Sequence, residues 1–170
     1  ENILKKNVWK KQDSSGGVVE CTVHGMPAGI GEPVFEKLDA ALAKSVMSIG
    51  AVKGVEIGDG FQAATSHGSI NNDAFTCENG SISKLTNHSG GILGGMSDGS
   101  DIVLRAAFKP TPSISQVQQT VTTTSENIDL SIHGRHDPII VPRAVVVVES
   151  MVALTLIDLL FANMSSRLDK

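Results

Sequence analysis

The chain has 170 residues, of which 41% are apolar and 19% charged, and its formal net charge is −4. This length fits one domain or part of one, and this apolar content excludes a disordered polypeptide. The acidic balance provides no basic face for nucleic acid, and two cysteines are too few for a disulfide framework. No spacing of His and Cys residues completes a zinc site. We therefore expect a globular domain that binds neither nucleic acid nor a metal ion.

The first third of the chain predicts a strand and then a helix. Apolar residues alternate over 16–26, which is typical of a strand with one face well buried. Gly and Pro residues interrupt the pattern over 27–33, and Pro33 suits the first position of a helix. Apolar residues then recur every three or four positions over 34–49. We expect an amphipathic helix there that ends near Gly50.

The middle of the chain predicts three more strands around a long irregular region. The stretch 51–61 is typical of a strand that ends in a Gly-Asp-Gly turn. Residues 62–100 are rich in Gly, Asn and Ser without a sustained period, so we expect a loop region with one short hairpin. Alternation returns over 100–110 and 126–134, which predicts two strands. The polar stretch 111–125 separates them.

The last element, over 143–168, is a long apolar helix. It is long enough to cross a bilayer, but Glu149 and Asp158 interrupt it. Each carboxylate would cost roughly 2.5–3.5 kcal/mol at the centre of a membrane. A helix packed between other layers of a protein explains apolarity on nearly all sides without that cost. We therefore expect an α+β layer architecture with no membrane partner.

Three stretches are candidates for chemistry, and each has a purely structural alternative. The five glycines of 87–101 allow a ligand to approach the main chain, but tight turns require glycines too. The cation and hydroxyls of 109–115 follow a strand, as at an anion-binding corner or in an ordinary turn. In 134–138, Arg135 offers a planar set of donors suited to phosphate or carboxylate. Asp137 precedes a proline and is held extended, where it has a role in a site or caps the following helix.

These stretches, in this order, resemble blocks of the chorismate synthase family. The similar blocks are DSSGGVVE, PAGIGEPVFEKLDA, SIGAVKGVEIGDGF, NHSGGILGG, KPTPSIS and GRHDPIIVPRAVVVVESM. The resemblance covers 13–162 and only the C-terminal half or so of a family member. It implies that 1–170 is the C-terminal portion of such a domain, with 62–100 as a loop region. The implied fold is α+β, a β-α-β sandwich in which antiparallel sheets pack on central helices, assembled as a homo-tetramer.

The resemblance also implies an activity. Family members are lyases of the shikimate pathway of aromatic amino acid biosynthesis, in the cytoplasm or in plastids. They convert 5-enolpyruvylshikimate 3-phosphate to chorismate by a 1,4-anti elimination of phosphate, using reduced FMN, with NADPH needed only indirectly to reduce the flavin. The family's two catalytic histidines lie in the N-terminal half, so we expect this chain alone to be inactive. The alternative is a non-catalytic module for flavin binding or assembly.

Individual residues take their implied roles from the same blocks. Asp137 matches the carboxylate that moves a proton through flavin N5, and Arg135 matches an arginine near flavin and substrate. We expect the guanidinium of Arg135 to keep Asp137 ionised. Pro112 stands where the family usually has Ser, which removes one hydroxyl and one N–H. The expected result is either weaker flavin binding or compensation by a neighbouring group. The implied cofactor-binding residues are Gly50, Ala51, Gly94, Lys109, Pro110, Thr111, Pro112, Ser113 and Arg135.

Overall fold

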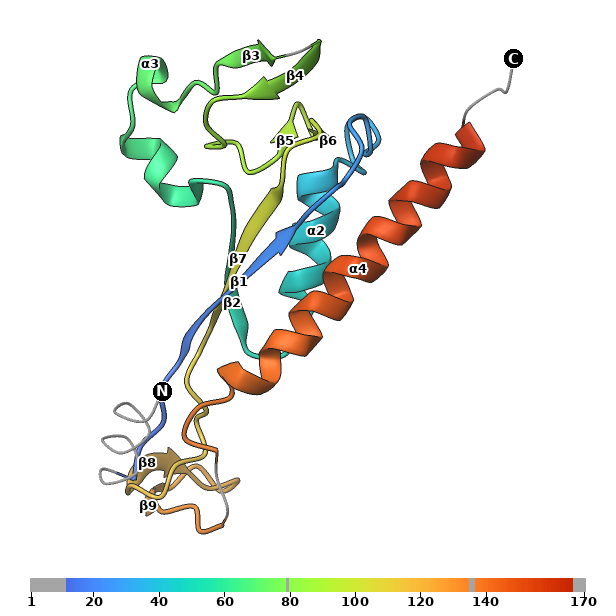
Figure 1. The fold of residues 1–170 in the computed structure, drawn as a ribbon. Helices are drawn as coiled ribbons and strands as arrows, with labels where there is room; N and C mark the ends of the chain where they lie inside the picture. Colours follow the sequence, from blue (N-terminus) through green and yellow to red (C-terminus); the bar gives the residue numbers. More distant parts are fainter. Residues whose placement is uncertain (1–11, 79, 135–136, 167–170) are drawn as a thin grey trace.

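A three-stranded antiparallel sheet with strand order β1-β7-β2 forms the centre of the fold (Figure 1). The computed structural model describes residues 12–78, 80–134 and 137–166. The three strands are β1 (Gly17–Val23), β2 (Val52–Ile57) and β7 (Ile102–Phe108). Each lies inside a stretch where apolar alternation predicted a strand, so these predictions are confirmed.

One face of this sheet is buried, and the other is largely open to solvent. Along the central strand β7, alternate residues from Ile102 to Phe108 are buried. On β1, Val19 lies opposite the buried Ala106 and is itself buried, whereas its neighbour Val18 is exposed on the opposite face. This alternation follows from the pleat of a strand, which sends successive side chains to opposite faces.

Two helices, α2 (Leu38–Met47) and α4 (Val141–Ser166), cover the buried face, and they also contact each other. Figure 1 shows both helices on the same side of the sheet. Burial of each large apolar side chain in this layer stabilises the fold by about 1.5–3 kcal/mol. The residues that the helices bury are Leu38, Leu42 and Val46 of α2 and Ala144, Val148, Val152, Leu156 and Leu159 of α4.

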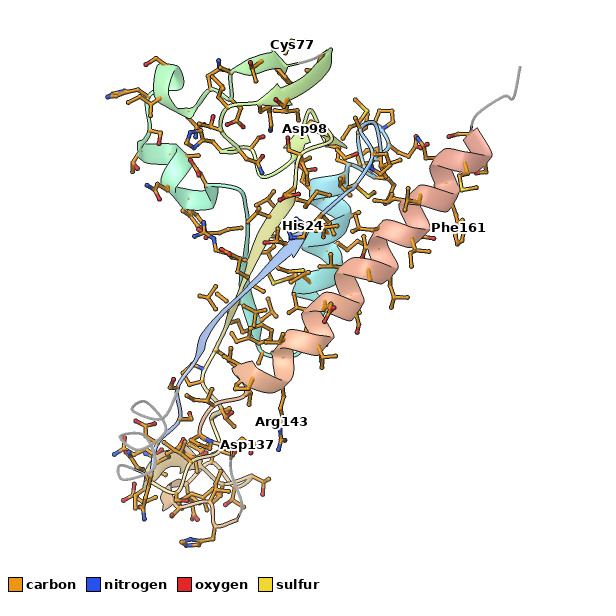
Figure 2. The ribbon with its side chains drawn as sticks, in the orientation of Figure 1. His24, Cys77, Asp98, Asp137, Arg143 and Phe161 are labelled. Atoms are coloured by element: carbon orange, nitrogen blue, oxygen red, sulfur yellow. The ribbon has the colours of Figure 1, made fainter. Side chains whose placement is uncertain are left out.

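The opposite face of α4 is apolar but exposed. Leu154 and Phe161 are each 63% exposed, and Val146 is 60% exposed. Figure 2 shows the Phe161 side chain pointing away from the rest of the fold. The helix predicted at 143–168 and the α+β class are therefore confirmed. In the part of the chain that the structure describes, however, only one face of α4 packs against other elements. By length and composition alone, this helix would also be sufficient to cross a bilayer.

The start of α2 differs from the sequence prediction, which placed it at Pro33. The helix begins at Leu38, because Val34 has a left-handed φ of 67° and cannot continue a helical turn. The first helical N–H, that of Leu38, donates to the carbonyl oxygen of Gly95 at 2.7 Å. Phe35, expected on the buried face of the helix, is 85% exposed. The helix start is thus fixed by a partner almost sixty residues away.

The region 62–100 contains more regular structure than the loop with one hairpin that we expected. Two short helical segments, η1 (Gly60–Thr65) and α3 (Gly68–Asn71), lead into two hairpins. The hairpins are β3 (Phe75–Glu78) with β4 (Ser81–Lys84), and β5 (Ile92–Leu93) with β6 (Met96–Ser97).

A further hairpin lies at the other end of the central sheet (Figure 1). It joins β8 (Gln118–Val121) to β9 (Asn127–Leu130). The strand predicted at 126–134 corresponds to β9. Its partner β8 lies in the stretch that we expected to be a polar connection, because β8 is polar and mostly exposed and lacks the alternation that marks a buried strand.

Candidate functional site

Three of the stretches singled out in the sequence meet at one end of the central sheet. The N–H of Lys109 donates to the carbonyl oxygen of Ala51 at 2.9 Å, which joins the end of β7 to the start of β2. Residues 14–15 connect these two to the start of α4: the Ser14 hydroxyl donates to the carbonyl oxygen of Thr111, and the Ser15 N–H donates to that of Pro138. The structure thus brings together 50–51, 109–113 and 137–138.

The backbone at Gly50 and Ala51 has the character of a binding position. Ala51 has a φ of 72°, a left-handed conformation that costs a residue with a side chain on the order of 1–3 kcal/mol and that clusters at functional sites. A Cβ added at Gly50 would meet no atom within 4 Å, so the main chain there is open to a ligand. A bulge between Val52 and Gly54 follows directly and shifts the register of β2 against β7.

The stretch 109–113 presents a cation and polar groups beside Ala51. Lys109, Pro110 and Pro112 are exposed, while Thr111 and Ser113 are half-buried. The carbonyl oxygen of Pro112 accepts hydrogen bonds within its own loop, from the Ile114 N–H and the Gln118 amide. The loop is therefore held by hydrogen bonds to the Pro112 carbonyl oxygen, and the charge of Lys109 remains available to an anionic ligand.

Asp137 forms an ion pair with Arg143, an arginine that sequence analysis did not single out. The distance between Asp137 Oδ2 and Arg143 Nη1 is 2.7 Å, and the side chains are 34% and 73% exposed (Figure 2). Arg143 lies in the first turn of α4, where the helix dipole disfavours a cation and favours an anion such as Asp137. The ion pair therefore offsets the unfavourable interaction of the Arg143 charge with the helix dipole. Arg135, the predicted partner of Asp137, lies outside the described residues.

Gly94 lies at the opposite end of the sheet from the other predicted flavin contacts. Gly94 and Gly95, with φ of 60° and 86°, form the two-residue turn between β5 and β6, as type I′ turns require. This hairpin adjoins the start of β7, whereas Lys109 follows its end. Seven strand residues span about 20 Å, so the structure does not bring Gly94 to Ala51 and Lys109.

Much of the Gly-rich stretch 87–101 binds groups of the chain itself. The N–H groups of His88 and Ser89 donate to the Asp73 carboxylate at 2.7 and 2.9 Å. The N–H of Gly91 donates to the side-chain oxygen of Asn87 at 2.8 Å. A Cβ at Gly91 would lie 2.5 Å from the Asp101 carbonyl oxygen. The first glycines of the stretch are therefore needed for close backbone packing, as the structural alternative predicted.

A buried cluster of charged side chains, which sequence analysis missed, contacts this stretch. The Nζ atom of Lys84 contacts oxygens of Asp98 at 2.7 Å, Ser89 at 2.9 Å, Asn87 at 3.1 Å and Asp73 at 3.4 Å. The side chains of Lys84, Asp73 and Asp98 are only 3%, 4% and 8% exposed. The sequence gives no signal for this burial, because a lysine beside a polar segment usually faces water.

The hydrogen bonds in this cluster decide the ionisation of its carboxylates. Burial disfavours the charged form of Asp73, yet hydrogen bonds from the Ser89 and His88 N–H groups outweigh it and hold the pKa of Asp73 far below its usual value. Burial likewise opposes ionisation of Asp98, and hydrogen bonds from Lys84 and Ser100 lower its pKa. Both carboxylates therefore stabilise the fold above about pH 4, and that contribution is lost as the pH falls further.

A second polar pair connects the Gly-rich stretch to the turn after β2. Nδ1 of His88 lies 2.8 Å from Oδ2 of Asp59, and both side chains are 28% exposed. The side chain of Asn71 also donates to Asp59, at 3.1 Å. Within residues 12–78, 80–134 and 137–166, no group of three or more His, Cys, Asp or Glu side chains is placed to hold a metal ion.

Comparison with known proteins identifies the family. The family model for chorismate synthase matches residues 2–161. The chorismate synthase of Lachnoclostridium phytofermentans is 68% identical over 158 residues, covering 92% of this chain and 43% of the relative. That of Methanosarcina acetivorans is 59% identical over 161 residues, covering 93% of this chain and 44% of the relative.

A solved structure, a crystal structure of chorismate synthase, gives the same result. It matches with a TM-score of 0.77 and 33% identity, over 95% of this chain and 42% of that chain. The chain therefore spans less than half the length of the curated relatives that it matches. It belongs to the chorismate synthase family, and it corresponds to the C-terminal part of a family member.

Proposed function

We propose that this chain is the C-terminal portion of an enzyme that converts 5-enolpyruvylshikimate 3-phosphate to chorismate and phosphate, with reduced FMN as cofactor. Family membership supports the reaction. The observation that carries the site is the hydrogen bond of 2.9 Å between the Lys109 N–H and the Ala51 carbonyl oxygen. It joins two stretches, 58 residues apart, that the resemblance had separately assigned to the flavin.

The residues at this end of the sheet suit an anionic cofactor. Gly50 offers an exposed main chain, Ala51 a strained one, and Lys109 a cation beside them. Charge-assisted hydrogen bonds to such groups hold phosphates more strongly than neutral ones do. Reduced FMN, when bound here, supplies transient electron density that helps the phosphate of the substrate to leave.

Asp137 is the proposed acceptor of the proton lost in the reaction, and Arg143 orients its carboxylate. The Arg143 guanidinium lies 2.7 Å from Oδ2 of Asp137, and a charge-assisted hydrogen bond of this kind gives the carboxylate a defined orientation. Because Arg143 belongs to α4, the orientation of the carboxylate is coupled to the packing of this helix on the sheet.

The proposal includes the inactivity of this chain on its own. The family's catalytic histidines belong to the portion that the chain does not span, and the exposed face of α4 provides an apolar surface for that portion to cover. We call the complex of this chain with the N-terminal portion of the Lachnoclostridium phytofermentans relative the reassembled protein. It allows the contribution of each half to be tested separately.

The test is an anaerobic assay with reduced FMN and 5-enolpyruvylshikimate 3-phosphate, in which chorismate absorbance is followed. We expect no turnover by the chain alone and turnover by the reassembled protein. Asp137→Asn should lower kcat at least 100-fold, as general acid–base groups contribute about 10²–10⁴-fold. Arg143→Gln should lower kcat by a smaller factor than Asp137→Asn does, because it removes the ion pair that orients the carboxylate. Asp129→Asn, at an exposed position on β9, is the matched control.

Two outcomes would contradict the proposal. Normal turnover by Asp137→Asn would remove the proton-accepting role of this residue. Tight FMN binding by a reassembled protein that never turns over substrate would favour the alternative, a non-catalytic flavin-binding or assembly module.

A further inference from the structure

The cluster around Lys84 is the most buried group of charges among the described residues, and the proposed chemistry does not use it. Lys84 is the last residue of β4, and its side chain is 3% exposed. Its ammonium group faces two carboxylates, those of Asp73 and Asp98, which are also almost fully buried. A charge in such a place is unfavourable unless it is paired and hydrogen-bonded, so the arrangement needs an explanation.

Each acceptor that holds Lys84 through a carboxylate or amide oxygen also holds the main chain of the Gly-rich stretch. Asp73 accepts from two N–H groups, and Asn87 and Asp98 accept from one each. These oxygens thus form a layer with the ammonium on one side and the backbone on the other. The N–H donors on the backbone side are those of His88, Ser89, Gly91 and Ser100.

This backbone determines where the turn between β5 and β6 lies. The held residues fall on both sides of the turn, before Ile92 and after Ser97. When the turn lies in this position, its Gly95 carbonyl oxygen accepts the hydrogen bond from the first N–H of α2. A Cβ at Gly94 would meet no atom within 4 Å, so the tip of the turn is open to a ligand. A shift of the layer would therefore move both the tip and the start of α2.

The charges make the ammonium necessary for this arrangement. With Lys84, the cluster carries two negative charges and one positive charge, a sum of −1. Without it, two buried carboxylates would share one site at −2, and such a pair raises the pKa of one member until it is protonated. A protonated carboxyl loses acceptor capacity, so one of the backbone N–H groups would lose its partner.

We propose that Lys84 is a positioning residue: its buried ammonium keeps Asp73 and Asp98 ionised together, and through them it fixes the Gly-rich stretch and its open turn at Gly94. This inference is independent of the proposed function, because it concerns only groups within this chain.

The test compares Lys84→Met with the double variant Lys84→Met/Asp98→Asn in the reassembled protein. Hydrogen exchange is measured on the amides of 88–91, with the amides of β7 as an internal reference. We expect Lys84→Met to raise exchange at 88–91 at least tenfold. The double variant restores the sum of −1, and we expect it to return exchange to within about threefold of the wild type.

The rescue separates positioning by charge from packing alone. If Lys84 acted only by filling space, the double variant would exchange at least as fast as Lys84→Met, and this result would overturn the inference. Unchanged exchange in Lys84→Met would overturn it too. The effect of Lys84→Met should also be at least as large at pH 5 as at pH 7, because a lower pH favours the protonated carboxyl that has lost acceptor capacity.

Two further results keep the test decisive. If Lys84→Met does not fold, Asp98→Asn alone is measured: it leaves one carboxylate per ammonium, so exchange at 88–91 must stay within threefold of the wild type, and a larger change refutes the inference. If the wild-type reassembled protein binds no FMN, the proposed function fails, while exchange and rescue still decide the role of Lys84.

Discussion

Two leucines on α4, two residues apart, provide the sharpest test of the idea that this helix is an inner layer of the complete protein. Leu156 is 6% exposed and belongs to the buried core, whereas Leu154 is 63% exposed. In the chain alone, Leu156→Ala leaves a cavity in the core and should cost about 2–5 kcal/mol of unfolding free energy. Leu154→Ala should change that free energy by less than about 0.5 kcal/mol.

Leu154 should become important when the N-terminal portion of the relative is added. Complete burial of a leucine side chain is worth about 1.5–3 kcal/mol, so covering the exposed 63% of Leu154 is worth roughly 1–2 kcal/mol. Leu154→Ala should therefore weaken the association of the two portions about 5- to 30-fold. Urea denaturation of the chain gives the first quantity, and titration with the N-terminal portion gives the second. A loss of association below twofold would show that the outer face of α4 remains uncovered, which would refute the reasoning.

Other positions give independent predictions. Asp73→Asn should destabilise the chain by about 3–5 kcal/mol at pH 7, because it disrupts a buried charge network. This loss of stability should become smaller below about pH 4, where wild-type Asp73 loses its own contribution. Thermal melts at pH 7 and pH 3 measure the two differences in stability. Gly91→Ala should lower the melting temperature by several degrees, since φ is +79° and the new Cβ has no room, whereas Gly68→Ala, in open space, should not. Cys77 is exposed and should react with a thiol reagent faster than Cys21. Burial, together with the nearby carboxylate of Glu149 on α4, raises the pKa of Cys21, so less of its reactive thiolate is present; equal rates would contradict this order.

The central layer of the fold could be predicted from the sequence because its signals are local. The alternation over 16–26 and 100–110 reports the pleat of β1 and β7, and the long apolar run reports α4. The start of α2 could not be predicted in the same way. The spacing of apolar residues after Pro33 is helical, but the helix begins only where the distant Gly95 carbonyl accepts the N–H of Leu38.

The candidate site shows the same limit. The stretch 109–113 and Asp137 could be marked in advance by their composition and by family resemblance, yet their contact through residues 14–15 depends on the register of β1 against β7. Arg143 resembled any charged residue at a helix start. Lys84 was missed for a different reason: four acceptors, up to 14 residues away along the chain, converge on its ammonium only after two hairpins have formed.

The hydrogen bond from Ser15 to Pro138, with the parallel bridge between Ser15 and Ile139, fixes the residues before β1 against the segment that leads into α4. Residues 14–15 therefore lie next to the segment that carries Asp137. A connected chain presents its first half to Asp137 at an effective concentration of roughly millimolar order, whereas two separate pieces must find each other by diffusion. Dilution should consequently abolish turnover in a split protein long before it affects an intact one.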